Sequence, residues 1–297
     1  MTRLTASFYN VISGLPPFPG KVRLANALGK MGSKLGDGHT SVCVGPRARL
    51  DLDLSDRVQR QMWAGCYEPH VRKCLETLLA EGDVFLDVGA HIGYVSAIAA
   101  SVVGPQGKVF VFEADPVLYS KLTRNLKQLP WVQAFHCAVW SKTCTLVFER
   151  SPSEGESGWG SLTSVRDHGR GECVQVNALS IDDWAARFGV ARIRAIKVDA
   201  EGSEADIFQG ARQTIARFRP TLVVEMNDVL LRGAGVSADE LASRLIRESY
   251  TLFGLTWMRL EPFRDTSPSL ASEILCIPRE RAAIELGALK RAGFRLC

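Results

Sequence analysis

Apolar residues along the chain form short continuous runs that alternate with stretches of helical periodicity. In the clearest case, the run 84–88 is broken only by Asp87, and it is followed by Gly89, Gly93 and apolar residues at helical spacing as far as Gly104. A short apolar run of this kind is typical of a strand that is buried on both faces. The pattern therefore predicts a strand, a glycine turn and a helix, in that order.

The same alternation continues to residue 226. Further strands are predicted at 108–112, 131–140, 143–149, 193–198 and 221–224. Helices are predicted to begin at the capping signals Asp115, Ser180, Ser203 and Ser237. Strands that alternate with helices form a parallel sheet with helices on both faces. The last two apolar runs, 250–257 and 273–277, are joined by a loop alone, so one of them should be antiparallel.

The first 80 residues follow a different pattern. Residues 1–36 contain five Lys or Arg and neither Asp nor Glu, residues 41–54 alternate as in a hairpin, and 71–79 has the periodicity of an amphipathic helix. We expect an N-terminal extension, 1–80, on a domain formed by 81–297. The basic arm could face an anionic substrate or a membrane surface, although such arms more often serve as docking or lid elements.

The residues around the glycine turn indicate which ligand it would bind. A dinucleotide fingerprint needs glycines at the first, third and sixth positions, and the second and third of these are His91 and Tyr94 here. Asp87 precedes the turn and suits a cationic ligand, while Glu113 ends the next strand at the distance where an acid pairs with a ribose diol. These features favour S-adenosylmethionine, a nucleoside with a positive centre and no phosphate. The alternative is an ordinary strand-to-helix turn with an incidental acid.

Composition and charge narrow the class of protein. The chain has 297 residues, 46% of them hydrophobic, and a net charge of +4, which implies no strong field for nucleic acid. No apolar run reaches the length of a membrane span, and no signal peptide is evident. Eight cysteines without a Cys-x-x-Cys pair argue against a zinc site and against a disulfide framework. We therefore expect a cytoplasmic protein that forms no stable membrane insertion, binds no nucleic acid and could form a homo-oligomer.

Five motifs occur in an order that resembles the FkbM-type methyltransferases. They are Gly65-Cys-Tyr-Glu-Pro69, Asp87-Val-Gly-Ala-His-Ile-Gly-Tyr94, Phe112-Glu-Ala-Asp-Pro116, Leu179-Ser-Ile-Asp-Asp183 and Ile196-Lys-Val-Asp-Ala-Glu-Gly-Ser-Glu204. The resemblance covers about 50–278, and the last motif is its most specific part. It implies a Rossmann-like class I methyltransferase fold with a seven-stranded, mostly parallel sheet. It also implies S-adenosylmethionine-dependent methylation of a hydroxyl on a small metabolite such as a sugar or polyketide-type natural product. Two residues depart from the family pattern: His91 replaces a usual Asn, and Ala114 a usual Pro.

Candidate catalytic residues follow from this chemistry. A neutral hydroxyl is a poor nucleophile, so a base or a metal should help to remove its proton. Asp199 and Glu201 follow one strand two residues apart and would point the same way if the backbone stays extended, and His91 could act as a base. Alternatively, Asp199 and Glu201 could be helix-cap and turn carboxylates, and His91 could hydrogen-bond the turn. Cofactor-binding candidates are Asp87, Gly89, Ala90, His91, Gly93, Glu113, Ala114, Ala138 and Asp199, with Tyr67 and Glu68 implied by the resemblance alone.

A magnesium ion is a further alternative, because Asp199, Glu225 and Asn227 offer the oxygen ligands that it prefers. The segment 151–172 is a long loop whose single large aromatic, Trp159, is expected to close over the acceptor. Two other functions remain open at this point. One is a nicotinamide-dependent oxidoreductase, which the missing third-position glycine disfavours. The other is a non-catalytic S-adenosylmethionine-binding module, which the acids at several strand ends disfavour.

Overall fold

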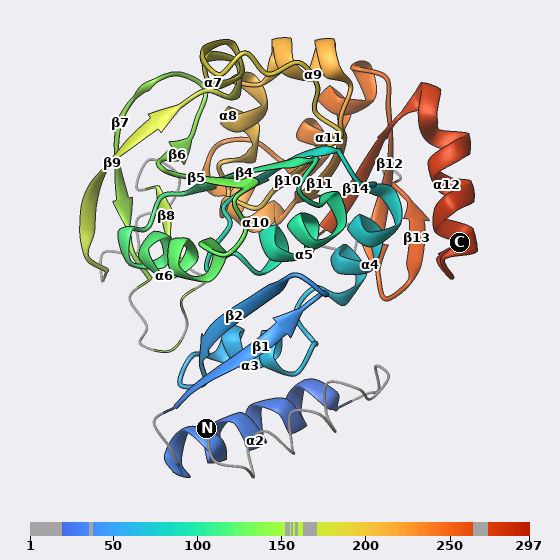
Figure 1. Cartoon of the computed structure of the whole chain (residues 1–297). Coiled ribbons are helices and arrows are strands. Elements are labelled where there is room, and N and C mark those ends of the chain that lie inside the picture. Colours follow the sequence, from blue (N-terminus) through green and yellow to red (C-terminus); the bar gives the residue numbers. More distant parts are fainter. Residues whose placement is uncertain are drawn as a thin grey trace.

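The computed structural model describes residues 20–35, 38–151, 155, 157, 160–162, 171–263 and 273–297, with 32–35 described in their backbone alone. A nine-stranded sheet forms the centre of the molecule, in the order β15-β13-β12-β14-β11-β10-β3-β4-β5 (Figure 1). The parallel half of the sheet contains β3 (Val84–Val88), β4 (Lys108–Glu113), β5 (Val132–His136), β10 (Ala195–Val198) and β11 (Thr221–Glu225). The predicted alternation of strands and helices therefore gives the predicted parallel sheet.

The other half of the sheet is mixed. β14 (Glu273–Pro278) is antiparallel to both of its neighbours, β11 and β12 (Tyr250–Thr256), which confirms that one of the last two predicted strands reverses. Two short strands, β13 (Arg259–Pro262) and β15 (Arg295–Leu296), extend the edge beyond β12. Because of these two strands, the sheet has nine strands and not the predicted seven.

Helices cover both faces of the sheet. One face packs against α4 (Pro69–Leu78), α5 (Tyr94–Val103), α6 (Pro116–Leu126) and α12 (Ala282–Arg291), which follows η2 (Arg279–Arg281). The opposite face packs against α7 (Ile181–Arg187), α8 (Glu204–Gln209), α9 (Arg212–Phe218), α10 (Asp228–Gly233) and α11 (Ala238–Arg247). Successive residues of β3 alternate between the two cores, since Phe85 belongs to the first and Leu86 to the second. None of the described helices combines the length and apolar character that a membrane crossing requires.

The N-terminal elements pack on the α5 side of the sheet. They comprise α2 (Lys21–Leu35), the antiparallel hairpin of β1 (His39–Val44) and β2 (Ala48–Asp53), and α3 (Arg57–Trp63). The hairpin contributes Val42, Leu50 and Leu52 to the same hydrophobic core as α5. This packing brings α3, which is capped by the Asp56 side chain, close to the carboxyl ends of the central strands.

A small second sheet corrects the prediction for residues 131–140. The expected single strand divides at Cys137 into β5 and β6 (Ala138–Val139), and β6 leaves the large sheet to pair with β9 (Cys173–Leu179). β9 also pairs with β7 (Cys144–Glu149), which in turn pairs with β8 (Ser161–Leu162). β9 is not among the predicted strands, although Val174, Val176 and Ala178 alternate with polar residues.

Two helix predictions also need correction. The single helix predicted to begin at Ser203 is two helices, α8 and α9, and Ser203 makes no side-chain cap because its own backbone is already helical. Instead, the Glu204 carboxylate accepts the N–H groups of Ala200 and Gly202, at 3.0 and 3.3 Å, and so holds the turn that follows β10. α10 is not among the predicted helices, although Asn227 caps it. The caps at Asp115, Ser180 and Ser237 are confirmed.

Candidate active site

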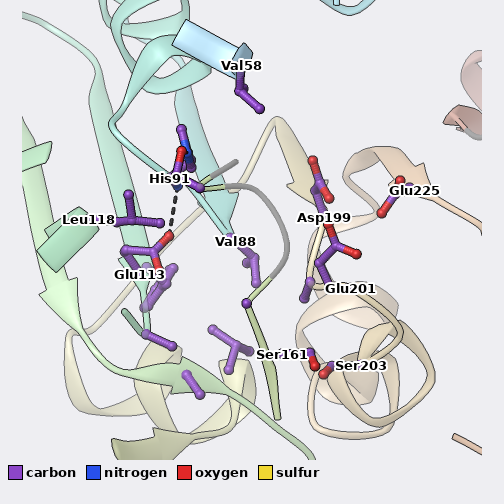
Figure 2. Close-up of a pocket in the computed structure, with 18 of the residues that line it drawn as sticks. Val58, Val88, His91, Glu113, Leu118, Ser161, Asp199, Glu201, Ser203 and Glu225 are labelled. Atoms are coloured by element: carbon purple, nitrogen blue, oxygen red, sulfur yellow. Dashed lines mark hydrogen bonds between the residues drawn. The ribbon is translucent and has the colours of Figure 1, made fainter. Parts of the chain in front are cut away.

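A cavity of about 600 Å³ lies at the carboxyl ends of β3, β4, β10 and β11. Figure 2 shows that one side of the cavity is formed by the region of His91, Glu113 and Leu118, and the other by Asp199, Glu201 and Glu225. The predicted site residues that line it are Tyr67, Glu68, Gly89, His91, Glu113, Ala114, Ala138, Asp199, Glu201, Glu225 and Asn227. This edge of an open α/β sheet is where ligands of such folds bind.

Three of the predicted cofactor residues are not in the cavity wall. Asp87, Ala90 and Gly93 do not line the cavity. The Asp87 side chain is fully buried, and its Oδ2 accepts the hydroxyl of Ser96 on α5 at 2.5 Å. Burial is the largest effect on this carboxyl and raises its pKa. Asp87 therefore supports the turn from beneath, since its side chain lies in the α5 core and away from the cavity.

The glycine turn after β3 is shaped by close contact with β10. Gly89 has a φ of +78°, and a Cβ placed on it would lie 1.7 Å from the Asp199 carbonyl oxygen. No side chain fits this position, because the end of β10 approaches the backbone directly. His91 also has a positive φ, 56°, so the turn holds a non-glycine residue in the left-handed region. Such strain is found preferentially at functional sites.

The His91 imidazole lies between the turn and the N-terminal elements. Its Nε2 is 2.6 Å from Ser157 Oγ, and the Ser157 N–H donates to Asp56 Oδ2 at 2.9 Å. Burial lowers the pKa of His91 to about 4, so the ring is neutral at physiological pH and is a weak base. Its Nδ1 is buried and has no hydrogen-bond partner among the described residues. His91 lines the cavity, so its ring can contact a ligand that binds there.

Glu113 joins the turn to the next loop. Its Oε2 accepts the His91 N–H and its Oε1 accepts the Asp115 N–H, both at 2.8 Å. Burial raises the pKa of Glu113 to about 8, although the two N–H donors favour the charged form. Each oxygen keeps a second lone pair, so the carboxyl can also bind a diol. Leu118, Ala138, Val139 and Phe112 supply apolar surface nearby, which fits a nucleoside.

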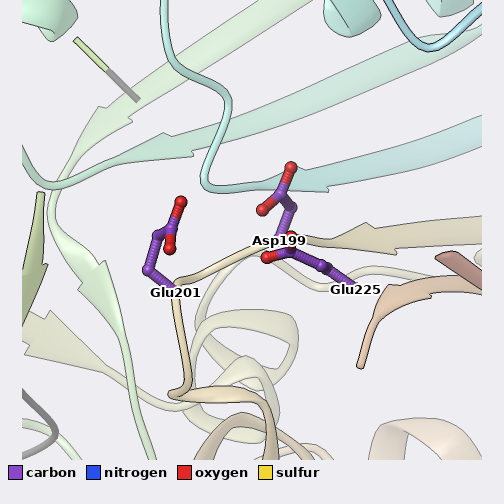
Figure 3. A group of neighbouring side chains, drawn as sticks. All are labelled: Asp199, Glu201 and Glu225. Carbon is purple, nitrogen blue, oxygen red and sulfur yellow. The ribbon is translucent and has the colours of Figure 1, made fainter. Parts of the chain in front are cut away.

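The opposite wall carries a group of carboxyl side chains. Asp199, Glu201 and Glu225 each offer an oxygen within 4.8 Å of the others (Figure 3). β10 ends at Val198 and Glu201 has a φ of 50°, so the extended backbone does not persist and the turn brings Glu201 back to Asp199. The Asn227 Oδ1 accepts the Val229 N–H as the cap of α10. Asn227 lines the cavity but does not belong to this carboxyl group.

Asp199 and Glu225 differ in protonation. Burial alone would raise the pKa of Asp199, but the Lys197 ammonium at 2.7 Å holds it below the usual value. Burial and the neighbouring Asp199 charge raise the pKa of Glu225 to about 11. Asp199 is therefore ionised and Glu225 is protonated, and the two share a hydrogen bond.

Several lining residues are not among the predicted ones. His70 Nε2 lies 3.3 Å from Glu273 Oε2, and both residues face the cavity from elements far apart in the sequence. Ser161 and Leu162 of β8 and Arg57 of α3 also line it. The pairing of the second sheet, the folding back of the N-terminal elements and the pairing of β14 with β11 bring these residues to the site. Trp159 lies outside the described residues.

The open sheet, the glycine turn and the acid at the end of β4 define a class I methyltransferase that uses S-adenosylmethionine. Residues 87–252, more than half of the chain, match the family model of the methyltransferase FkbM domain. The chain therefore belongs to the FkbM methyltransferase family, as the sequence motifs predict.

The individual proteins that the chain resembles share less than 30% sequence identity with it. The chain is 26% identical over 187 residues to the 2-O-methyltransferase NoeI of Sinorhizobium fredii, an alignment that covers 57% of this chain and 76% of the relative. It is 28% identical over 136 residues to the hexuronic acid methyltransferase AglP of Haloferax volcanii, covering 44% of this chain and 50% of the relative. Among solved structures, an FkbM methyltransferase from Methylobacillus flagellatus KT is similar with 16% identity and a TM-score of 0.44, over 76% of this chain and 56% of that one.

Proposed function

We propose that the protein transfers the methyl group of S-adenosylmethionine to a hydroxyl of a small metabolite, such as a sugar or a polyketide-type natural product. The observation that carries this proposal is the cavity with two unlike walls. One wall offers the Glu113 carboxyl and apolar surface for the nucleoside, and the other offers carboxyl groups for a hydroxyl. The relatives named for 2-O-methylation and for a hexuronic acid support a hydroxylated acceptor.

In this proposal Glu113 binds the ribose diol, and His91 uses its free Nδ1 to contact the cofactor. S-adenosylmethionine itself supplies the electrophilic sulfonium methyl. Asp199 accepts a hydrogen bond from the acceptor hydroxyl and orients its oxygen. As the O–CH₃ bond forms and the S–CH₃ bond breaks, S-adenosylhomocysteine leaves, and the hydroxyl proton, made acidic by the transfer, passes to the Asp199 carboxylate and then to water. Because Lys197 keeps Asp199 charged and weakly basic, orientation is its main contribution. Glu201 is placed beside it as a second contact to the acceptor. Tyr67 and Glu68 close this wall from the extension, which we propose comprises residues 1–80 on a domain of 81–297.

Magnesium is an alternative way to activate the hydroxyl. The carboxyl cluster that could hold it contains Asp199, Glu201 and Glu225, and the predicted ligand Asn227 lines the same cavity. The Lys197 ammonium lies against Asp199 Oδ2 and would compete with a cation there. We therefore favour methyl transfer without a metal, and the experiment below tests this preference directly.

The test is a methyl-transfer assay with radiolabelled S-adenosylmethionine. The acceptors are neutral methyl glycosides, a glucuronoside and a hydroxylated macrolactone, each with and without EDTA. We expect product on at least one hydroxyl and no effect of EDTA. Asp199→Asn should keep cofactor affinity and lower kcat by ~10²-fold or more, the usual contribution of a positioned polar group at the reacting atom. Full activity of Asp199→Asn would contradict the placement of the reaction, and loss of activity in EDTA with recovery in Mg²⁺ would establish the metal alternative.

The competing functions give different results in the same preparation. Binding of NADPH with a fluorescence change, and none of S-adenosylmethionine, would favour the oxidoreductase. Tight S-adenosylmethionine binding without turnover on every acceptor would favour a binding module. A cytoplasmic location, a homo-oligomer and the absence of nucleic-acid binding stay predictions that fractionation, light scattering and a DNA-binding assay can check.

A further inference from the structure

A buried lysine, Lys197, offsets the negative charge of the cavity wall that contains Asp199. The Lys197 side chain is 4% exposed and lies in the middle of β10, on the same face of the sheet as Asp87, its register partner on β3. Its Nζ is 2.7 Å from Asp199 Oδ2 and 3.6 Å from Glu68 Oε2. An apolar residue would pack at this position at less cost, because burying an ammonium removes it from water. The lysine therefore has a role beyond packing.

The two carboxyls around Lys197 both belong to the cavity wall. Asp199 follows β10, and Glu68 is the first residue before α4, where it adopts a left-handed φ of 40° without capping the helix by its side chain. Glu68 Oε2 has no hydrogen-bond partner among the described residues, and the Lys197 ammonium lies 3.6 Å from it, while a hydrogen bond with Tyr67 also holds this carboxyl. One cation thus links the extension to the residue that we place against the acceptor.

We propose that Lys197 is a positioning residue for methyl transfer: it fixes the Asp199 carboxylate in its charged form and orientation against the acceptor hydroxyl. This inference rests on the proposed function of Asp199. It assigns a role to Lys197, which touches neither the acceptor nor the methyl group.

Other titratable groups face the same carboxylate. Asp87 lies beneath it on β3, Tyr67 and Glu68 just before α4, Glu201 and Glu204 after β10, Glu225 on β11 and His91 on the glycine turn. None of these groups except His91 can carry a positive charge, so Lys197 is the ammonium that offsets the carboxylates. Without its charge, burial would favour protonation of Asp199. The acid limb of the kcat profile should then move to higher pH.

The chain offers a matched control for the loss of a buried ion pair. Arg194 precedes the same strand and pairs with Glu285 at 2.9 Å, and Glu285 is 3% exposed. Neither residue lines the cavity. Arg194→Met and Lys197→Met each remove one cation from a buried carboxylate, and only the second does so at the site. Glu285 keeps a second cation, Arg281 at 2.8 Å, so Arg194→Met controls for loss of an ion pair on this strand and not for an uncompensated buried charge.

The experiment compares Lys197→Met, Arg194→Met, Asp199→Asn and the double variant Lys197→Met/Asp199→Asn. It uses the acceptor that the wild type methylates, with thermal melting and S-adenosylmethionine calorimetry as fold checks. We expect Lys197→Met to lower kcat by ~10²-fold and to raise the acid limb by about one pH unit or more, while Arg194→Met changes kcat by less than ~threefold. The double variant should lose at most ~threefold more than Asp199→Asn alone, because the two residues act as one unit.

Two results would overturn the inference. One is a Lys197→Met enzyme with wild-type kcat and an unmoved acid limb. The other is a double variant whose loss is the product of the two single losses. If Lys197→Met does not fold, Lys197→Gln, which keeps the donors and removes the charge, carries the same expectations. Failure of the wild type on every acceptor would instead count against the proposed function. The charge state of Asp199 would then be read by NMR titration of its carboxyl carbon in wild type and Lys197→Met, with Asp199→Asn identifying the resonance, and an identical titration in both proteins would overturn the inference.

Discussion

Replacing Glu113 should separate a ribose-binding role from a structural one. The carboxyl already accepts two backbone N–H groups, from His91 and Asp115, so Glu113→Ala would also leave these donors without a partner. Glu113→Gln keeps one acceptor oxygen and nearly the same volume, and it is therefore the cleaner variant. At pH 9, where burial leaves the Glu113 carboxyl mostly ionised, a hydrogen bond to the charged group contributes ~1.5–3 kcal/mol, which corresponds to a roughly ten- to hundredfold loss of S-adenosylmethionine affinity. Calorimetry on the folded variant measures this directly.

The pH dependence of binding gives a second, independent test. The pKa of Glu113 is raised to about 8 by burial, so the carboxyl is mostly protonated at pH 7 and mostly ionised at pH 9. If the ionised form binds the diol, the affinity of the wild type should rise about tenfold between pH 7 and pH 9 and then level off, since one pH unit below the pKa leaves roughly a tenth of the group ionised. Glu113→Gln should lack this rise. The Glu113→Gln variant is also the control for titration of the amino group of the cofactor, because that titration affects binding to both proteins equally.

Unchanged affinity in a folded Glu113→Gln protein would refute the ribose assignment. The same would follow if wild type and variant showed identical pH curves. Loss of affinity together with a lower melting temperature would show that the two backbone hydrogen bonds are the main contribution. In that case the effect would reflect the shape of the turn.

Two further predictions concern the glycine turn. Gly89→Ala should destabilise the protein by ~2 kcal/mol or more, seen as a lower melting temperature, because its Cβ would meet the Asp199 carbonyl. The control is Gly189→Ala, which should cost only ~1 kcal/mol because φ is +60° there but no atom lies within 4 Å. Equal losses of stability in the two variants would contradict the argument from the contact. His91→Gln should lower kcat less than Asp199→Asn does. The slope of its kcat–pH profile between pH 6 and 9 should equal that of the wild type, because the pKa of His91 is about 4. If a limb of the wild-type profile disappeared in the variant, His91 would be the base.

Local sequence patterns determined the order of the elements and the first half of the site. A few consecutive residues are enough to specify each of three features: the apolar run before Gly89, the acid at the end of the next strand and the cap at Asp115. These features fix a strand, a turn and a helix N-terminus without long-range information. For this reason the parallel sheet, the glycine turn and Glu113 are all where the sequence predicts them.

Only the tertiary structure decided the second half of the candidate site. Whether the chain continues a strand past Cys137 depends on the partner that β6 finds in β9, whose paired residues are 40 positions away. His70 and Glu273 meet because α4 and β14 lie against one cavity, and their spacing in the sequence carries no signal of this. The protonation states of Asp199 and Glu225 could not be predicted from the sequence either. Asp199 is charged and Glu225 neutral because one of them touches the buried Lys197 ammonium, and burial and charge are properties of the folded chain and not of the residue type.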